Sequence, residues 1–273
     1  MKISTEIASI ANIVGMEKSV ELCAKAGFDG WDFSMFDVNQ IDMSRDIALA
    51  RELKKIGLDN GIVCNQSHAP FPVDQPAVRS YLMRSIECTA EAGGEICVVH
   101  PDNNKTAEEN AEMYAELLPF ARSHGVKIAI ENMWNWDKVK NESCFAACAT
   151  SEDFIKHIDI LQDDFLVACL DIGHAEMRGS GEGAANMIRA LGHRLQSLHI
   201  HDNDKWQDSH QIPFSMSIDF DEVVWALKEI HYPGYFTLEV DNFLPGYNES
   251  NVFDGVKTLM ASARKLADQF EQM

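Results

Sequence analysis

Short apolar runs typical of buried β-strands alternate eight times with longer helical patterns along this chain. The predicted strands start roughly 25 to 40 residues apart, which is the length of one strand–helix unit. They span residues 2–7, 28–33, 61–66, 95–100, 126–131, 166–171, 195–201 and 235–240. The predicted helices span residues 16–26, 44–57, 75–92, 106–124, 151–161, 181–193, 219–231 and 250–270. Strict alternation predicts a parallel sheet with right-handed crossovers.

Eight such units favour closure into a (β/α)₈ TIM barrel over an open, doubly wound sheet. The chain has 273 residues, and a barrel of this type needs about 250. Because no Pro-, Gly- or Ser-rich linker divides the sequence, we expect one α/β domain over residues 1–273. The active site of such a barrel lies at the C-terminal ends of its strands.

The chain is strongly acidic, with 43 Asp and Glu residues against 23 Lys and Arg residues and a formal charge of −20. Such a surface repels phosphate backbones and anionic lipids. No apolar stretch approaches the ~20 residues of a membrane span, and the short, polar N-terminal segment is not typical of a signal peptide. We therefore expect a cytoplasmic protein with a small neutral substrate and no nucleic-acid or membrane partner.

The seven cysteines include no Cys-x-x-Cys pair. Five lie in apolar runs, namely Cys23, Cys64, Cys88, Cys97 and Cys169. We interpret these five as small buried hydrophobic residues in a reducing compartment. The other two, Cys144 and Cys148, lie four residues apart and are interpreted as surface or packing residues.

Histidine and acidic residues stand at or just beyond the ends of predicted strands. They are His68, His100, Glu131, Asp171, His174, His199, Asp208, His210 and Glu239. A buried strand rarely ends in a carboxylate unless the charge is paired, and a full set of such residues at one barrel mouth predicts a metal site. Three carboxylates with one imidazole suit Mn²⁺, Mg²⁺ or Co²⁺. The residues in this set are Glu131, Asp171, His199 and Glu239.

Several segments resemble the xylose-isomerase-like barrel superfamily, which holds sugar isomerases and epimerases, inosose dehydratases and endonuclease-IV-like DNA repair enzymes. They are AGFDGWDF (26–33), SHAPF (67–71), VVHP (98–101), IAIEN (128–132), LDIGHA (170–175), LHIHDND (198–204), DSH (208–210) and YFTLEV (235–240). They run over almost the whole chain. Together they are specific for the superfamily, but they do not single out one member.

The chain also resembles the ketose 3-epimerases of the tagatose and psicose type. This resemblance implies one divalent metal, Mn²⁺ first, on the four-residue set, with Glu131 and Glu239 as the catalytic acid and base. Asp137 lies six residues after Glu131, where those epimerases carry a substrate-binding Glu. Lys205 lies six residues after His199, where they carry an Arg. Since Lys cannot give the planar two-point hold of Arg, the identity of the sugar stays open.

Aromatic residues near the predicted strand ends can stack on the apolar face of a sugar ring. They are Trp31, Phe71, Trp134, Trp136, Trp206 and Phe214. The predicted long loop 133–143 (MWNWDKVKNES) is expected to set specificity. The full set of predicted substrate contacts is His68, His100, Trp134, Asp137, His174, Lys205 and His210.

The nine histidine and acidic residues also match the three-zinc site of endonuclease-IV-like enzymes, so the resemblance implies Zn²⁺ if a His-rich multinuclear site forms. The acidic charge argues against a DNA-binding face. We therefore interpret His68 and His100 as contacts to sugar hydroxyls rather than as metal ligands. Two roles stay open for His210, which could line the substrate mouth or hold a second metal.

The function predicted from these features is a metal-dependent sugar isomerase or epimerase. It would abstract a proton next to a carbonyl through a metal-stabilised enediolate, on an unphosphorylated ketose or related sugar, since no Gly-rich anion-binding loop is evident. The alternatives are a sugar or cyclitol lyase or dehydratase, a zinc phosphodiesterase of endonuclease-IV type, and a barrel that binds sugar or metal without catalysis. A homodimer or homotetramer is expected from the superfamily.

Overall fold

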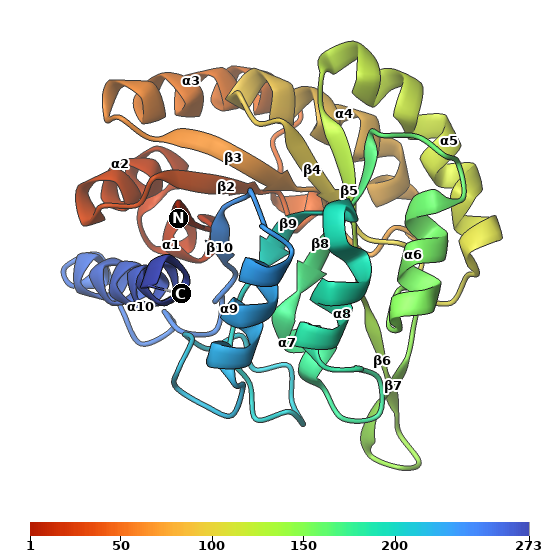
Figure 1. Ribbon diagram of the computed structural model, residues 1–273. Coiled ribbons are helices and arrows are strands. Elements are labelled where there is room, and N and C mark those ends of the chain that lie inside the picture. Colours follow the sequence, from red (N-terminus) through yellow and green to blue (C-terminus); the bar gives the residue numbers. More distant parts are fainter. Residues whose placement is uncertain (273) are drawn as a thin grey trace.

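Eight parallel strands form the inner wall of a (β/α)₈ barrel, and helices surround them (Figure 1). The structure is a computed structural model that describes residues 1–272. The barrel strands are β1 (Ile3–Thr5), β2 (Gly30–Ser34), β3 (Val63–His68), β4 (Ile96–Val99), β5 (Lys127–Glu131), β8 (Leu166–Asp171), β9 (Leu195–His199) and β10 (Phe236–Leu238). All eight predicted strands are confirmed, and their ends differ by at most two residues.

The strands pair in sequence order around the barrel. Six of them form one parallel sheet in the order β2-β3-β4-β5-β8-β9, and β1 pairs with β10. Two parallel bridges join these sheets, one between Glu6 and Asp32 and one between Ile200 and Leu238. Because the ring is closed by parallel strands, all C-terminal strand ends meet at one mouth.

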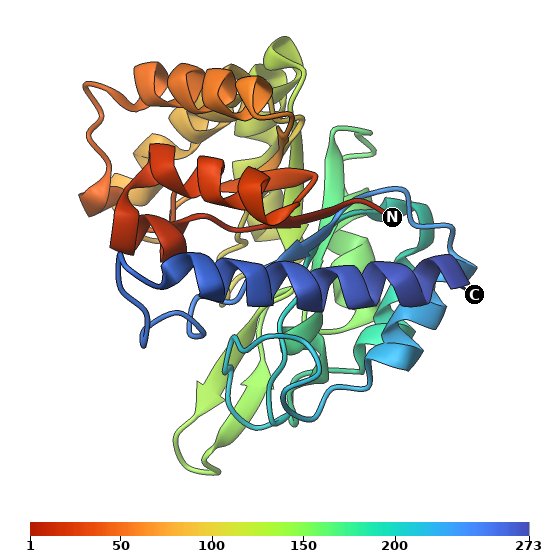
Figure 2. The ribbon, with the colours of Figure 1, turned by 90° about the vertical axis from the view of Figure 1, so that its left-hand side faces the viewer.

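The eight predicted helices are also confirmed and pack outside the strands. They are α2 (Met16–Ala26), α3 (Asp46–Asp59), α4 (Pro76–Ala92), α5 (Ala107–His124), α6 (Ser151–Asp159), α8 (Ala184–Leu191), α9 (Phe220–Glu229) and α10 (Val252–Gln272). Local signals explain their bounds. Helix α5, for example, begins after a capping box between Thr106 and Glu109 and ends at Gly125, whose φ is 68°. Figure 2 shows α10 lying along the outside of the barrel.

Two short helices and one hairpin differ from the sequence prediction. Two short helices, α1 (Ala8–Val14) and α7 (Ile172–Glu176), follow β1 and β8. The segment predicted as a loop over 133–143 is instead a β-hairpin of β6 (Trp134–Asp137) and β7 (Glu142–Phe145), so the loop prediction was wrong. Its turn reverses through Asn141, which has a φ of 57°. The hairpin projects away from the barrel in both views (Figures 1 and 2).

The barrel interior combines a small apolar cluster with a polar network. The cluster consists of Val98, Ala129, Val167 and Cys169. In the network, Gln66 Nε2 donates to Asp32 Oδ2 at 2.8 Å, while Ser197 Oγ and Thr237 Oγ1 donate to Gln66 Oε1 at 2.7 and 3.2 Å. This network connects strands from opposite parts of the ring. Among the described helices, none is both long and apolar enough to cross a membrane.

Candidate functional site

A cavity of about 520 Å³ opens at the C-terminal ends of the barrel strands. Seven of the nine histidine and acidic residues selected from the sequence line it, namely His68, His100, Glu131, His174, Asp208, His210 and Glu239. The other two, Asp171 and His199, end β8 and β9 and are buried. The strand ends therefore bring almost all of the predicted donors to one place.

The Glu131 carboxylate lies among four imidazole rings. Its Oε2 is 3.4 Å from His68 Nε2, 3.3 Å from His100 Nε2 and 3.2 Å from His199 Nδ1. Its Oε1 is 3.5 Å from His174 Nδ1. Burial opposes the carboxylate charge, but His199 and His100 outweigh it and hold the pKa of Glu131 well below its usual value. Glu131 is therefore ionised at neutral pH.

His199 lies close to three carboxylates. Its Nδ1 is 3.2 Å from Glu131 Oε2 and 3.5 Å from Glu239 Oε2, and its Nε2 is 3.7 Å from Asp32 Oδ2. Burial, with a further contribution from the charge of Glu131, raises the pKa of Glu239. The two glutamates therefore have pKa shifts of opposite direction in the metal-free site.

Asp171 is held by its neighbours at the start of α7. Its Oδ1 accepts the backbone N–H of His174 at 2.7 Å and lies 3.1 Å from His201 Nε2. The side chain of Asn132 binds both the N–H and the C=O of Asp171, at 2.7 and 3.0 Å. Within residues 1–272, Asp171 Oδ2 is buried without a hydrogen-bond partner, so this oxygen is free to bind a ligand.

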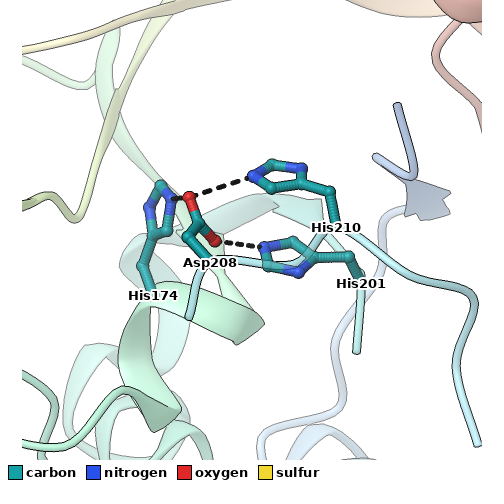
Figure 3. Close-up of side chains that lie close together, drawn as sticks. All are labelled: His174, His201, Asp208 and His210. Atoms are coloured by element: carbon teal, nitrogen blue, oxygen red, sulfur yellow. Dashed lines mark hydrogen bonds and ion pairs between the residues drawn. The ribbon is translucent and has the colours of Figure 1, made fainter. Parts of the chain in front are cut away.

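Asp208 connects three histidines (Figure 3). Its Oδ2 is 3.2 Å from both His174 Nε2 and His210 Nε2, and its Oδ1 is 3.5 Å from His201 Nε2. The His201 and His210 rings stack with their centroids 3.9 Å apart. Burial opposes the charge of His210, but the hydrogen bond to Asp208, together with the charges of Asp208, Glu239 and Asp241, outweighs it and raises the pKa of His210 to about 10.

Several buried donor atoms at the strand ends fit a bound cation. Among the described residues, Glu131 Oε2, Asp171 Oδ2 and both ring nitrogens of His199 lack hydrogen-bond partners. Buried polar atoms are normally paired, and a metal ion would pair these. Donor atoms within 4.8 Å of one another also occur at this site in several sets. They include His68–His100–Glu131, His68–His199–Glu239, Glu131–Cys169–His199 and His174–His201–Asp208–His210. The donor chemistry supports a divalent metal.

In the part of the chain that the structure describes, two residues predicted as substrate contacts do not line the cavity. Asp137 closes the hairpin turn, because its Oδ1 accepts the N–H groups of Val139 and Lys140 at 2.8 and 3.1 Å. Lys205 Nζ is 2.8 Å from Glu176 Oε2 and is occupied by that ion pair. These two side chains are therefore not part of the cavity lining, and their role as substrate contacts stays a prediction.

Two of the six aromatic candidates, Trp134 and Phe71, line the cavity. Trp134 Nε1 also donates to Asp208 Oδ2 at 3.2 Å. Trp31 is fully buried and faces Gly57 of α3, on the helix side of β2. In the described part of the chain, three aromatic candidates do not line the cavity, namely Trp136, Trp206 and Phe214.

Besides His201, three supporting residues were not selected from the sequence. Asp32 lies beside His199, Asn132 holds the backbone of Asp171, and Phe36 packs edge-on against His68 with ring centroids 4.9 Å apart. A signal for two of them was present. Asp32 and Asn132 are polar residues within apolar strand motifs, AGFDGWDF and IAIEN, and a buried polar residue requires a partner.

Comparisons with known proteins agree with this architecture. The family model described as xylose isomerase-like TIM barrel matches residues 20–267. The uncharacterized protein MJ1311 of Methanocaldococcus jannaschii is 27% identical over 245 residues, covering 83% of this chain and 80% of that protein.

Two solved structures show the same fold at low sequence identity. The crystal structure of the IOLI protein with a zinc atom gives a TM-score of 0.80 at 18% identity and covers 100% of both chains. That of a D-tagatose 3-epimerase-like protein gives 0.72 at 22% identity, covering 98% of this chain and 99% of the other. From the family match over residues 20–267, the chain belongs to the xylose isomerase-like TIM barrel family.

Proposed function

We propose that this protein is a metal-dependent sugar isomerase or epimerase that moves a proton next to a carbonyl group. The observation that carries the proposal is the pair of buried glutamates, Glu131 and Glu239, whose Oε2 atoms lie 3.2 and 3.5 Å from the same His199 nitrogen. Both carboxylates line one cavity. One carboxylate can therefore accept a proton while the other supplies one.

The metal would be held by the donor set predicted from the sequence, which comprises Glu131, Asp171, His199 and Glu239. A divalent ion, with Mn²⁺ as our first choice, supplies Lewis-acid polarisation of the substrate carbonyl when bound. The unpaired buried atoms of Glu131, Asp171 and His199 support this assignment. The zinc atom in the IOLI structure supports a divalent metal in this family without fixing the ion here.

The protein's own groups carry the proton transfer. One glutamate removes the proton from the carbon next to the carbonyl, which leaves a planar enediolate. The other glutamate returns a proton to the opposite face for epimerisation, or to the adjacent carbon for isomerisation. His68 and His100, with Nε2 atoms 3.0 Å apart, are placed to bind sugar hydroxyls, and Trp134 can cover the apolar face of the ring.

The charge of the cavity supports an unphosphorylated sugar. Among the described residues, no Lys or Arg lines the cavity. Its acidic lining residues are Asp74, Asp102, Glu131, Asp208, Glu239 and Asp241. A phosphate group would meet repulsion there, whereas neutral hydroxyls can donate hydrogen bonds to carboxylates. A ketose is the first substrate class to test, and the similarity to a D-tagatose 3-epimerase-like structure supports that order.

The decisive experiment follows deuterium from solvent into the sugar. The metal-loaded protein is incubated in D₂O with a panel of unphosphorylated ketoses, and NMR records C–H exchange next to the carbonyl and any new epimer. We expect exchange with at least one ketose, lost in Glu131→Gln and Glu239→Gln and kept in Asp241→Asn. Absence of exchange with every sugar would refute the proposal. Release of water with exchange would instead indicate the dehydratase alternative.

A second candidate, a multinuclear zinc phosphodiesterase, is favoured by one observation. Two donor sets extend beyond the predicted metal ligands. They are His68–His100–Glu131, which shares Glu131 with them, and His174–His201–Asp208–His210. The acidic cavity argues against a DNA substrate. Cleavage of abasic DNA by zinc-loaded protein, together with two or three zinc ions per chain, would favour this candidate over the sugar enzyme.

A further inference from the structure

A second group of side chains with metal-ligand atoms lies outside the barrel mouth, where β7 leads into α6. We propose that Cys148, Asp153 and His157 form a separate structural zinc site at the base of the β6–β7 hairpin. A sulfur, a carboxylate oxygen and a ring nitrogen from these residues lie within 4.8 Å of one another. This set shares no residue with the cavity described above.

His157 presents an unused nitrogen to this site. Its side chain is fully buried, and its Nδ1 lies 2.9 Å from Tyr114 Oη. Within residues 1–272, the other ring nitrogen, Nε2, is buried without a hydrogen-bond partner and lies 3.6 Å from Asp153 Oδ2. If Nδ1 donates to the tyrosine hydroxyl, the Nε2 lone pair is left for a metal. Metal-binding histidines are commonly oriented by such a bond on the opposite ring nitrogen.

Cys148 is held in an unfavourable backbone conformation. Its φ is 62°, in the left-handed region that non-glycine residues rarely adopt, and its side chain is fully buried. Its backbone N–H donates to Asp153 Oδ2 at 2.8 Å. Strained residues of this kind persist where the surroundings hold them and often mark functional positions. Here the conformation places the thiol beside the carboxylate and the imidazole.

The chemistry of the three donors selects zinc. A thiolate and a carboxylate cancel the two positive charges of the ion, and the imidazole adds a neutral ligand. Thiolate ligands favour Zn²⁺ over Mg²⁺ or Mn²⁺, and structural zinc sites are tetrahedral. The Asp153 side chain is 38% exposed, which gives the ion a path in and leaves room for water as a fourth ligand.

The site would fasten the hairpin to the barrel. Ala147, next to Cys148, accepts the backbone N–H of Met133 at 3.1 Å, so the two ends of the hairpin meet here. Asp153 and His157 lie on α6, and Tyr114 lies on α5. A bound zinc would therefore connect the hairpin base to two helices and fix the strand that carries Trp134 into the cavity.

Cobalt substitution tests the proposal on the full-length protein. The protein is stripped with a chelator and refilled with Co²⁺, and its near-ultraviolet absorption is recorded, because thiolate bound to cobalt gives a charge-transfer band. We expect this band in the wild type and its loss in Cys148→Ser, with one fewer zinc per chain by elemental mass spectrometry. Cys144→Ser, on β7, and Cys169→Ser, beside His199, should keep the band.

The outcomes decide the site independently of the proposed sugar chemistry. A band that survives in Cys148→Ser, or one that disappears only in Cys169→Ser, overturns the proposal. If Cys148→Ser does not fold, Asp153→Asn replaces it, and unchanged zinc affinity in that variant also overturns the site. Tyr114→Phe, which frees His157 Nδ1, should weaken zinc binding by about 10- to 100-fold.

Discussion

Replacing Glu239 with glutamine tests whether the buried carboxylates of the cavity hold a metal. A ligand present at 100 times its dissociation constant stabilises a protein by about 2.7 kcal/mol. Removal of a charged side chain that itself binds the metal should weaken metal binding by at least ~100-fold, because loss of a residue that only orients a ligand already weakens it by up to about 100-fold. At the same metal concentration the stabilisation then falls to about 0.4 kcal/mol. The difference corresponds to a Tm lower by about 5–9 °C.

The same substitution should have no such cost in the metal-free protein. Burial and the neighbouring charge of Glu131 raise the pKa of Glu239, so an ionised carboxylate at this position destabilises the fold. Glutamine has nearly the same shape without the charge. In excess chelator, Glu239→Gln should therefore be at least as stable as the wild type.

Differential scanning calorimetry with excess Mn²⁺ and with chelator measures both differences. Asp241→Asn is the matched control, because this carboxylate is 44% exposed and lies 3.3 Å from His210 Nδ1, yet it is outside the predicted ligand set. The control should keep the full metal-induced rise in Tm. The reasoning is refuted if Glu239→Gln also keeps that rise, or if it is less stable than the wild type by the same amount with and without metal.

Three further substitutions test other parts of the structure. Asp46→Asn should lower the free energy of unfolding by about 1 kcal/mol at pH 7, discounted because its partner Arg84 is 37% exposed. Burial opposes the Asp46 charge, but hydrogen bonds, first of all the one from Arg84, lower the pKa of Asp46. The stabilisation is therefore present above about pH 4 and is lost as the pH falls further. Urea unfolding over a pH series measures this, and a difference that does not depend on pH contradicts it. Trp134→Ala should raise KM by roughly 2- to 10-fold through loss of stacking, with steady-state kinetics as the measurement and an unchanged KM as the contrary result. Asp137→Asn should leave kcat/KM within about twofold of the wild type, since Asp137 lies outside the cavity, and a larger loss would place it at the substrate after all.

Residues at strand ends could be predicted because the strand pattern itself fixes their direction. Glu131 and Asp171 each follow a continuous apolar run, and such a run predicts a buried strand. In a closed parallel barrel, every strand end points to the same mouth. The sequence position of each carboxylate therefore predicted its place in space without knowledge of any contact.

Residues beyond the strand ends could not be placed in the same way. Asp137 and Lys205 were selected through the resemblance to the epimerases, which carry a Glu and an Arg six residues after the residues that match Glu131 and His199. Spacing along a chain fixes no direction once the strand has ended. At Asp137 the chain enters a hairpin turn whose N–H groups use the carboxylate. At Lys205 the chain has a φ of 66°, and the side chain pairs with Glu176. Local backbone bonding thus determined both positions.

The position of Glu131 makes the number of bound ions decisive for the chemistry. Its Oε2 is within 3.4 Å of nitrogens from His68, His100 and His199, so it belongs to two donor sets at once. One ion held by Glu131 and His199 would leave a carboxylate oxygen of Glu131 to accept a substrate proton. A second ion held by His68, His100 and Glu131 would lower the basicity of that carboxylate. Single occupancy therefore fits proton transfer, and multiple occupancy fits hydrolysis by a metal-activated water.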